Sequence, residues 1–206
     1  AVSGDVTVAG TFGTSTASTI VMSGSSATLA ATSGLYNLNV TGTVGLGTHA
    51  LSLAGGLTVS GTLSDVAGSF GMTVAGATAV SGTLIGGAGD TITLNGTGVA
   101  LSSFTANTST VVIGGSGVVF DPASQSFYNL TIGGTVTTLS AGFTVASAFA
   151  LSGSLAAGAN TIAIKGNWSN SGAFTSGTST VSFGSGSHAI DGATSFYNLS
   201  DKIGRA

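Results

Sequence analysis

One tetrapeptide occurs three times in this chain: as Leu35-Tyr36-Asn37-Leu38, as Phe127-Tyr128-Asn129-Leu130 and as Phe196-Tyr197-Asn198-Leu199. The chain has three tyrosines, and each copy takes one of them. The tyrosine positions differ by 128 − 36 = 92 and by 197 − 128 = 69, and both intervals are whole multiples of 23. Self-similarity at a fixed period is typical of repeat architectures. We therefore expect the three copies to occupy equivalent places in a stack of repeats.

The similarity extends upstream of the tetrapeptides. Residues 105–124 match residues 175–194 at an offset of 70, with Thr110 matching Thr180 and Asp121 matching Asp191. Before the first copy, residues 19–22 stand where residues 110–113 stand later. A phenylalanine opens each copy: Phe12, Phe104 and Phe174. The repeated unit therefore lies near 12–40, 104–132 and 174–200, and is predicted to form strand, turn, strand and an aromatic-bearing strand.

The apolar pattern predicts short strands and no helix. Apolar residues alternate with Ser, Thr, Asn and Gly, as in residues 91–94, and no window carries apolar residues at helical spacing. Such strands can build a sandwich, a barrel or a solenoid. The repeat favours the solenoid, because there each coil lies on the one below and similar residues stack. We predict an all-β chain with a single domain over residues 1–206, a parallel β-solenoid of about nine coils of roughly 23 residues each.

The composition excludes several classes of protein. Charged residues are 4% of the chain, there is no Glu, and the cations are Lys165, Lys202 and Arg205, so we expect no nucleic-acid partner. With 42% hydrophobic residues the chain is unlike a disordered one. The chain has no cysteine. No apolar run is long enough to cross a bilayer, so we expect no transmembrane helix. Stacking explains the missing charge, since like charges repel when coils lie about 4.8 Å apart.

The C-terminal part resembles a repeat of very large bacterial cell-surface proteins. The pattern is carried by Gly166-Asn167-Trp168, Phe174, residues 180–183, residues 190–192 and Phe196-Tyr197-Asn198-Leu199. It is similar to the repeats of β-helical adhesins, filamentous-haemagglutinin-like exoproteins and autotransporter passengers. The match is close for 166–199, fair for 104–164 and weak before 64. The resemblance implies an extracellular, right-handed parallel β-helix with an adhesive or scaffolding role, and it brings no catalytic residues with it.

No group of residues predicts catalysis, a cofactor or a metal. His49 and His188 lie in different coils without a repeated acidic partner, and Asp121 and Asp191 occupy turn positions where Asp bonds its own backbone. Residues 86–92 resemble a calcium-binding nonapeptide, but they are one residue short and occur once. We interpret them as a glycine-rich corner. We therefore expect no enzyme, no cofactor and no metal.

Six Asn-x-Ser/Thr sequons occur, at Asn39, Asn95, Asn107, Asn129, Asn167 and Asn198. Asn129 and Asn198 belong to the repeated tetrapeptide and are interpreted as members of a buried amide ladder. Asn95, Asn107 and Asn167 remain candidate N-glycosylation sites, which would suit a surface glycoprotein.

The leading functional hypothesis is a structural protein of the cell surface. We see no polar cap at either terminus, and an uncapped solenoid end is an open sheet edge. We therefore expect the solenoid to continue end to end, with identical copies in an extracellular filament or with flanking repeats of a longer fibre or surface layer. The alternative is an adhesin segment that binds surface glycans, for which Trp168 is the only strong aromatic candidate, although we expect a core or corner position for this residue rather than an exposed one. A polysaccharide-active β-helix enzyme is a remote alternative, since it would need a groove with clustered acids.

Overall fold

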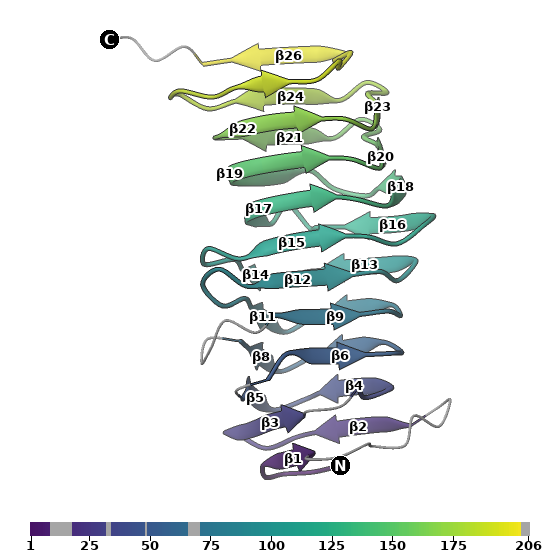
Figure 1. Cartoon of the computed structure of the whole chain (residues 1–206), viewed down its shortest axis with the longest axis vertical. Coiled ribbons are helices and arrows are strands. Elements are labelled where there is room, and N and C mark those ends of the chain that lie inside the picture. Colours follow the sequence, from purple (N-terminus) through teal and green to yellow (C-terminus); the bar gives the residue numbers. More distant parts are fainter. Residues whose placement is uncertain (9–17, 32–33, 48, 66–70, 203–206) are drawn as a thin grey trace.

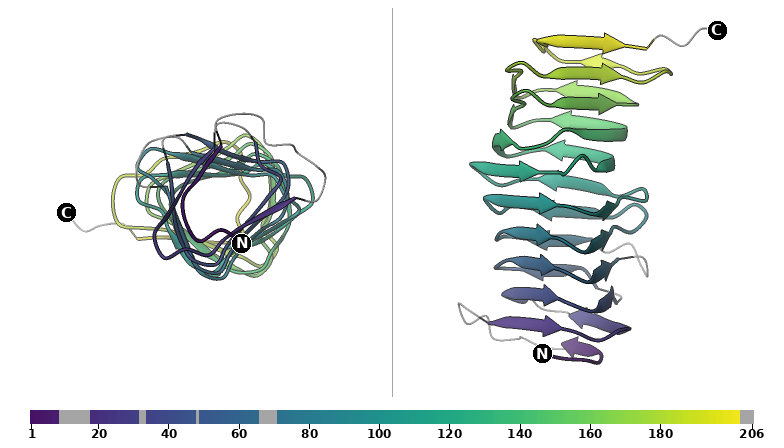
Figure 2. Two further views of the ribbon diagram at one scale, coloured as in Figure 1. Left: turned by 90° about the horizontal axis from the view of Figure 1, so that it is seen from below. Right: turned by 180° about the vertical axis from the view of Figure 1, so that it is seen from behind.

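The computed structural model describes residues 1–8, 18–31, 34–47, 49–65 and 71–202, and every regular element in those ranges is a β-strand (Figure 1). All pairings between these strands are parallel. The chain winds upward around one axis, with the N-terminal coil at one end of the rod and the C-terminal coil at the other (Figures 1 and 2). Strands on the near side of Figure 1 run to the right as the chain rises, so the winding is right-handed. The prediction of a parallel β-solenoid is confirmed.

The first of three sheets has nine strands and is called face A. Its strands, in order, are β2 (Thr19–Met22), β4 (Asn37–Val40), β7 (Leu57–Val59), β10 (Thr78–Val80), β13 (Gly98–Leu101), β16 (Val118–Asp121), β18 (Thr135–Leu139), β20 (Ser154–Ala156) and β23 (Ala173–Thr175). One strand per coil gives about nine coils, as expected.

The second sheet has six strands and begins face B. Its strands are β1 (Val6–Val8), β3 (Ala27–Ala31), β5 (Thr43–Leu46), β8 (Thr62–Ser64), β11 (Thr83–Ile85) and β14 (Phe104–Thr105). The third sheet has eleven strands. These are β6 (Leu51–Leu53), β9 (Met72–Val74), β12 (Thr91–Leu94), β15 (Thr110–Ile113), β17 (Ser126–Ile132), β19 (Phe143–Leu151), β21 (Thr161–Ile164), β22 (Asn167–Asn170), β24 (Thr180–Phe183), β25 (Ile190–Asp191) and β26 (Asn198–Asp201).

Two long strands, β17 and β19, turn a corner and join the second sheet to the third. The first part of β19 pairs with β21, whereas its last part pairs with β22. Phe104 of β14 packs on Phe127 of β17, with ring centroids 5.5 Å apart, and its N–H donates to Gln125 Oε1 at 3.1 Å. Face B therefore continues above β14 through the first parts of β17 and β19 and then β21, β24 and β26. The remaining strands of the third sheet, with the last parts of β17 and β19, make face C.

The coils are shorter than the spacing of the tetrapeptides predicted. On face C, Leu130 lies above Val111 and below Phe149, and both steps are 19 in residue number. On face A, the step from Thr78 up to Val99 is 21. Among the described residues, the number of residues between paired positions in adjacent coils ranges from 23, between Val6 and Leu29, to 17, between Leu29 and Leu46. Corners of different length cause this spread, while the strands keep their register.

Apolar side chains stack in columns inside the coil. One column on face C runs through Ile92, Val111, Leu130, Phe149 and Trp168, each at most 1% exposed. Burying each such side chain contributes about 1.5–3 kcal/mol. The column is aliphatic in the middle coils and aromatic above them, so the alternation seen in the sequence becomes one continuous core.

Glycine lines the corners because the coils touch there through their backbones. At the corner between faces C and A, a Cβ on Gly134 would overlap the carbonyl oxygen of Gly115, and a Cβ on Gly153 would overlap that of Gly134. The corner between faces A and B repeats the arrangement, with Gly61 against Gly42 and Gly82 against Gly61. A larger residue would separate neighbouring coils at these points.

The three tetrapeptide copies lie at three different corners, so the expectation that they stack in one column is wrong. Tyr36 follows Leu35, which bridges to Leu53 on face C, and precedes β4 on face A. Tyr128 lies inside β17, between its face B and face C parts, and Tyr197 precedes β26 on face B. Tyr128 and Tyr197 are 69 residues apart, which is three coils of 19 residues plus 12 residues. These 12 extra residues are about two thirds of a coil, so Tyr197 lies two corners further round the solenoid than Tyr128. Phe12, expected to open the first copy, lies outside the described residues.

Candidate functional site

The asparagine of the repeated tetrapeptide bridges three successive coils. Asn129 Nδ2 donates to Thr110 Oγ1 in the coil below at 3.2 Å, and Asn129 Oδ1 accepts from the Ala148 N–H in the coil above at 3.1 Å. Asn37 does the same, with Thr19 Oγ1 below at 3.4 Å and the Gly56 N–H above at 2.7 Å. The amide thus joins a threonine side chain to a backbone N–H. This differs from the predicted amide ladder, in which asparagine would bond asparagine.

The upstream part of the repeat now has a structural explanation. Each copied threonine strand lies directly beneath the tetrapeptide strand that follows it, with Thr19 paired to Asn37, Thr110 to Asn129 and Thr180 to Asn198. The repeated unit is therefore two stacked strands, about one coil apart in sequence. It needs only a threonine below and a free N–H above, so it fits any corner of a parallel coil.

Asn198 differs from the other two copies because it lies in the last described coil. Its Nδ2 approaches Thr180 Oγ1 at 3.4 Å, but no described strand lies above β26. Large apolar side chains are exposed in this coil: Ile190 is 44%, Tyr197 61% and Leu199 51% exposed. At the other end of the rod Val2 is 38% exposed. The end coils thus present apolar side chains and unpaired strand edges.

A polar pair covers part of the C-terminal end, which the sequence had not revealed. His188 stacks on Phe183 with ring centroids 4.7 Å apart, and His188 Nε2 lies 3.4 Å from Asp201 Oδ1. Asp201 occupies the place above Phe183 in β26, where the column below is apolar. The expectation that neither terminus carries a polar cap is therefore wrong for this column. The pair leaves Tyr197 and Leu199 uncovered.

Trp168 belongs to the core and not to an exposed flank. It is 1% exposed and lies against Phe149, Phe174 and Phe196, with ring centroids 4.5, 5.2 and 5.3 Å away. Its Nε1–H donates to Thr194 Oγ1 at 3.2 Å, so its one polar group is satisfied inside the coil. The aromatic candidate for glycan binding is thus not available to a ligand.

The three candidate glycosylation sites are exposed but differ in how their amides are used. Asn107 Nδ2 donates to Gly86 O at 2.7 Å, so a glycan on that nitrogen would compete with this bond. Asn167 lies in β22, and its Oδ1 accepts from the Ala189 N–H at 2.9 Å. Asn95 follows β12 in a turn, and its Oδ1 lies over Gly114.

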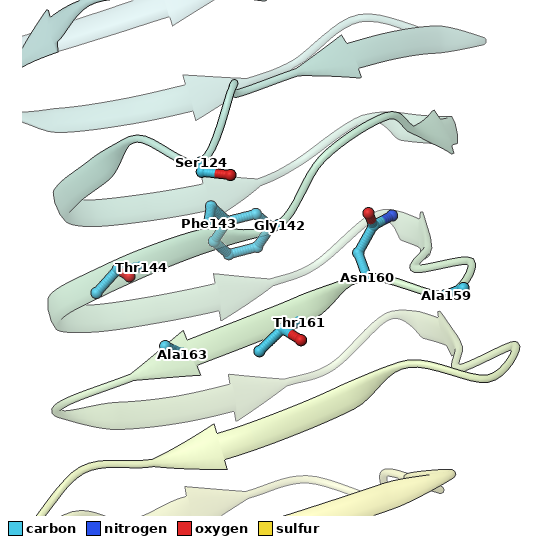
Figure 3. Close-up of a pocket in the computed structure, with 8 residues that line it drawn as sticks. All are labelled: Ser124, Gly142, Phe143, Thr144, Ala159, Asn160, Thr161 and Ala163. Carbon is cyan, nitrogen blue, oxygen red and sulfur yellow. The ribbon is translucent and has the colours of Figure 1, made fainter.

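Two shallow hollows lie along face B. The larger, about 370 Å³, is bordered by β19, β21 and the corner residue Ser124 (Figure 3). Phe143 forms its floor and is 3% exposed. Asn160 at its edge donates to Leu139 O at 2.6 Å and Ala157 O at 2.9 Å. The second, about 360 Å³, lies beside Tyr128 and Asn107. No Asp, Lys or His lines either hollow.

Four of the six aspartates, Asp65, Asp90, Asp121 and Asp191, lie at corners. Asp121 Oδ1 accepts from the Ala123 N–H at 3.0 Å, and Asp191 Oδ1 accepts from the Gly192 N–H at 2.9 Å, which confirms their turn role. Residues 86–90 form the predicted glycine-rich corner, with the Asp90 N–H 3.4 Å from Gly87 O. Asp90 and Asp65 are both buried there, a pairing that sequence reasoning missed.

Within the ranges that the structure covers, no three His, Asp, Glu or Cys side chains gather as metal ligands would. Over the same ranges, no helix has the length and hydropathy needed to cross a membrane. We compared the chain with known protein families, with curated proteins and with solved structures, and none of them matched it.

Proposed function

We propose that this chain is a structural segment of an extracellular surface filament, fibre or surface layer, and that its solenoid continues end to end. The continuation is formed either by the coils of a second copy or by flanking repeats of a longer chain. The observation that carries the proposal is the last coil, where Tyr197 and Leu199 are exposed at β26 on face B and Ile190 is exposed in β25 on face C, and neither strand has a described strand above it. A further parallel coil laid on this end would pair both strand edges and cover these side chains.

The sides of the rod support the same proposal. Val119 is the one large apolar side chain exposed between the end coils, among the residues that the structure describes. Charged residues are 4% of the chain. Side-by-side contacts therefore have little apolar area or charge to use, whereas end contacts have both backbone hydrogen bonds and apolar burial. The cell-surface location rests on the Ser, Thr and Gly richness and on the resemblance of residues 166–199.

The test compares two single substitutions of matched exposure. Leu199→Asp places a charge on the end coil, and Val119→Asp, at a site 47% exposed, places it on the side of the rod. We expect the unmodified chain and Val119→Asp to form rods that lengthen with concentration, by sedimentation velocity and electron microscopy. We expect Leu199→Asp to remain monomeric.

If the continuation comes instead from a longer chain, a tandem duplication of the sequence will show it. Coverage of the first β26 by the second copy should slow amide hydrogen exchange in β26, because its edge is then paired. Two results together would overturn the proposal: no concentration-dependent rods, and unchanged exchange of the first β26 in the tandem chain.

The adhesin alternative has no exposed aromatic residue to bind a glycan at Trp168, because this side chain is buried. No feature of the described faces favours it over the structural role.

A further inference from the structure

Two aspartates from successive coils meet inside the corner between faces B and C. Asp65 follows β8, and Asp90 precedes β12 one coil above. They are 2% and 3% exposed, and none of their four carboxyl oxygens accepts a hydrogen bond of good geometry from the described residues, although the Gly71 N–H is close enough to Asp65 to oppose the rise in its pKa. Burying one charged carboxylate without a partner is costly, and burying two side by side adds their repulsion.

The backbone at Gly87 packs closely against this pair. A Cβ on Gly87 would overlap both Asp90 Oδ2 and the carbonyl oxygen of Asp65. The glycine therefore allows the corner to pack directly against the carboxyls. A larger residue there would push the two coils apart or displace the Asp90 side chain.

Equivalent corners show what this position requires. Ser109 precedes β15 as Asp90 precedes β12, and Ser109 Oγ donates to Ala106 O, three residues back, at 2.6 Å. A turn of similar form at a different corner, between faces A and B, gives a second comparison: Asn160 precedes β21, and its Nδ2 donates to Ala157 O, also three residues back, at 2.9 Å. Both side chains are donors. A carboxylate cannot donate a hydrogen bond, whereas a carboxylic acid can.

No lysine or arginine is available in this part of the chain to neutralise the pair with a salt bridge. Residues 1–164 contain no Lys and no Arg. The strands packed around the corner, β8, β9, β11 and β12, carry no titratable side chain, and neither do residues 66–70 or 106–109. His49, in the corresponding corner one coil below, is the nearest titratable residue in that corner column.

We propose that Asp65 and Asp90 share one proton, and that this proton is a pH-sensitive latch that holds two successive coils together at the corner. With the proton in place, one carboxyl donates to the other. When it leaves for solvent, two buried carboxylates face each other and the corner opens.

The direction of the pH dependence follows from the carboxyl that titrates. Burial above all, and then the neighbouring Asp90 carboxyl, raise the pKa of Asp65 from 3.8 to about 7, against the smaller opposing effect of the Gly71 N–H. Because the folded chain holds this proton more tightly than the unfolded chain, the latch contributes its full stability below about pH 3.8. That contribution falls as the pH rises towards about 7 and is absent above it.

The direct test needs no substitution. In the full chain labelled with ¹³C at aspartate Cγ, we expect one of the six aspartates to titrate with a midpoint near pH 7, and its signal to disappear in Asp65→Asn. If all six titrate below pH 5, the proposal is wrong.

Thermal unfolding provides the second test. We expect the Tm of the unmodified chain to fall by several degrees between pH 5 and pH 8, and this fall to vanish in Asp65→Asn and Asp90→Asn. Asp121→Asn, at a turn Asp bonded to a backbone N–H, is the matched control and should keep the fall. An equal fall in all four chains would contradict the latch. A rise in Tm with Ca²⁺ at pH 8 that Asp65→Asn abolishes would show a bound cation in place of the proton, and would also overturn it.

Discussion

Replacing Asn129 by alanine removes a bridge between three coils while leaving every strand in place. The substitution deletes the bond to Thr110 Oγ1 at 3.2 Å and leaves the Ala148 N–H without its acceptor at 3.1 Å. A net hydrogen bond is worth about 1 kcal/mol, and a donor left unpaired costs at least as much. We therefore expect Asn129→Ala to destabilise the chain by about 2 kcal/mol.

The last coil supplies a matched control in Asn198→Ala. Asn198 occupies the same place in its tetrapeptide and makes the same contact below, to Thr180 Oγ1 at 3.4 Å, but it has no strand above it among the described residues. Its side chain is exposed, so water can replace the lost bond. We expect this substitution to cost less than about 0.5 kcal/mol.

Urea unfolding measures the total loss of stability in each variant, and amide hydrogen exchange shows which coils lose it. Solenoid stability is roughly a sum of coil and interface contributions, so the local measurement is the sharper one. A loss of about 2 kcal/mol corresponds to roughly 30-fold faster exchange at Ala148 in Asn129→Ala. If Asn198→Ala lowered the free energy of unfolding as much as Asn129→Ala, the bridge between coils would not be the source of the stabilisation. A local turn preference of asparagine would then explain the repeat.

Three further predictions concern the core, the corners and the surface. Trp168→Ala should destabilise by about 3–5 kcal/mol, because it opens a cavity beneath the last coil, and Trp168→Phe should cost clearly less; both are read by urea unfolding. Gly134→Ala should destabilise the chain by more than about 1 kcal/mol, because the new Cβ would overlap a carbonyl oxygen. Gly98→Ala has open space around the new Cβ, so its effect should stay within about 0.5 kcal/mol. Equal effects of the two substitutions would contradict close backbone contact at the corners. After expression through a eukaryotic secretory pathway, glycopeptide mass spectrometry should find glycan at Asn95 and not at Asn107, whose amide is already bonded.

The parallel coil could be predicted from the residues, but its length could not. Alternation of apolar and small polar residues marks strands, and near-copies mark stacking. Coil length depends on the corners, and these differ: only Gly133 and Gly134 separate β17 from β18, whereas the whole stretch 86–90 separates β11 from β12. The copied tetrapeptides suggested too long a coil because their spacing contains part of a turn as well as whole coils.

The candidate sites were predictable where a residue acts within its own turn. Asp121 bonds the backbone two residues on, and its sequence context is sufficient to predict that. The pair of Asp65 and Asp90 lies outside the copied units, in two different coils, and is created by the coil length at that corner. The signal available in the sequence was negative: no Lys or Arg precedes residue 165. A carboxyl group buried before residue 165 therefore cannot be neutralised by a lysine or an arginine from that part of the chain.

The three corners occupied by the repeated tetrapeptide also bear on how a filament would join. Because the same unit works between faces C and A at Asn37 and between faces B and C at Asn129, it is independent of the face on which it lies. Its requirements are a threonine in the strand below and a backbone N–H in the strand above. Asn198 meets the first through Thr180, and any parallel strand laid on β26 would meet the second. The end of the rod therefore requires a backbone N–H and not a particular side chain, and under the proposed end-to-end continuation we expect a further coil of the same kind to satisfy it.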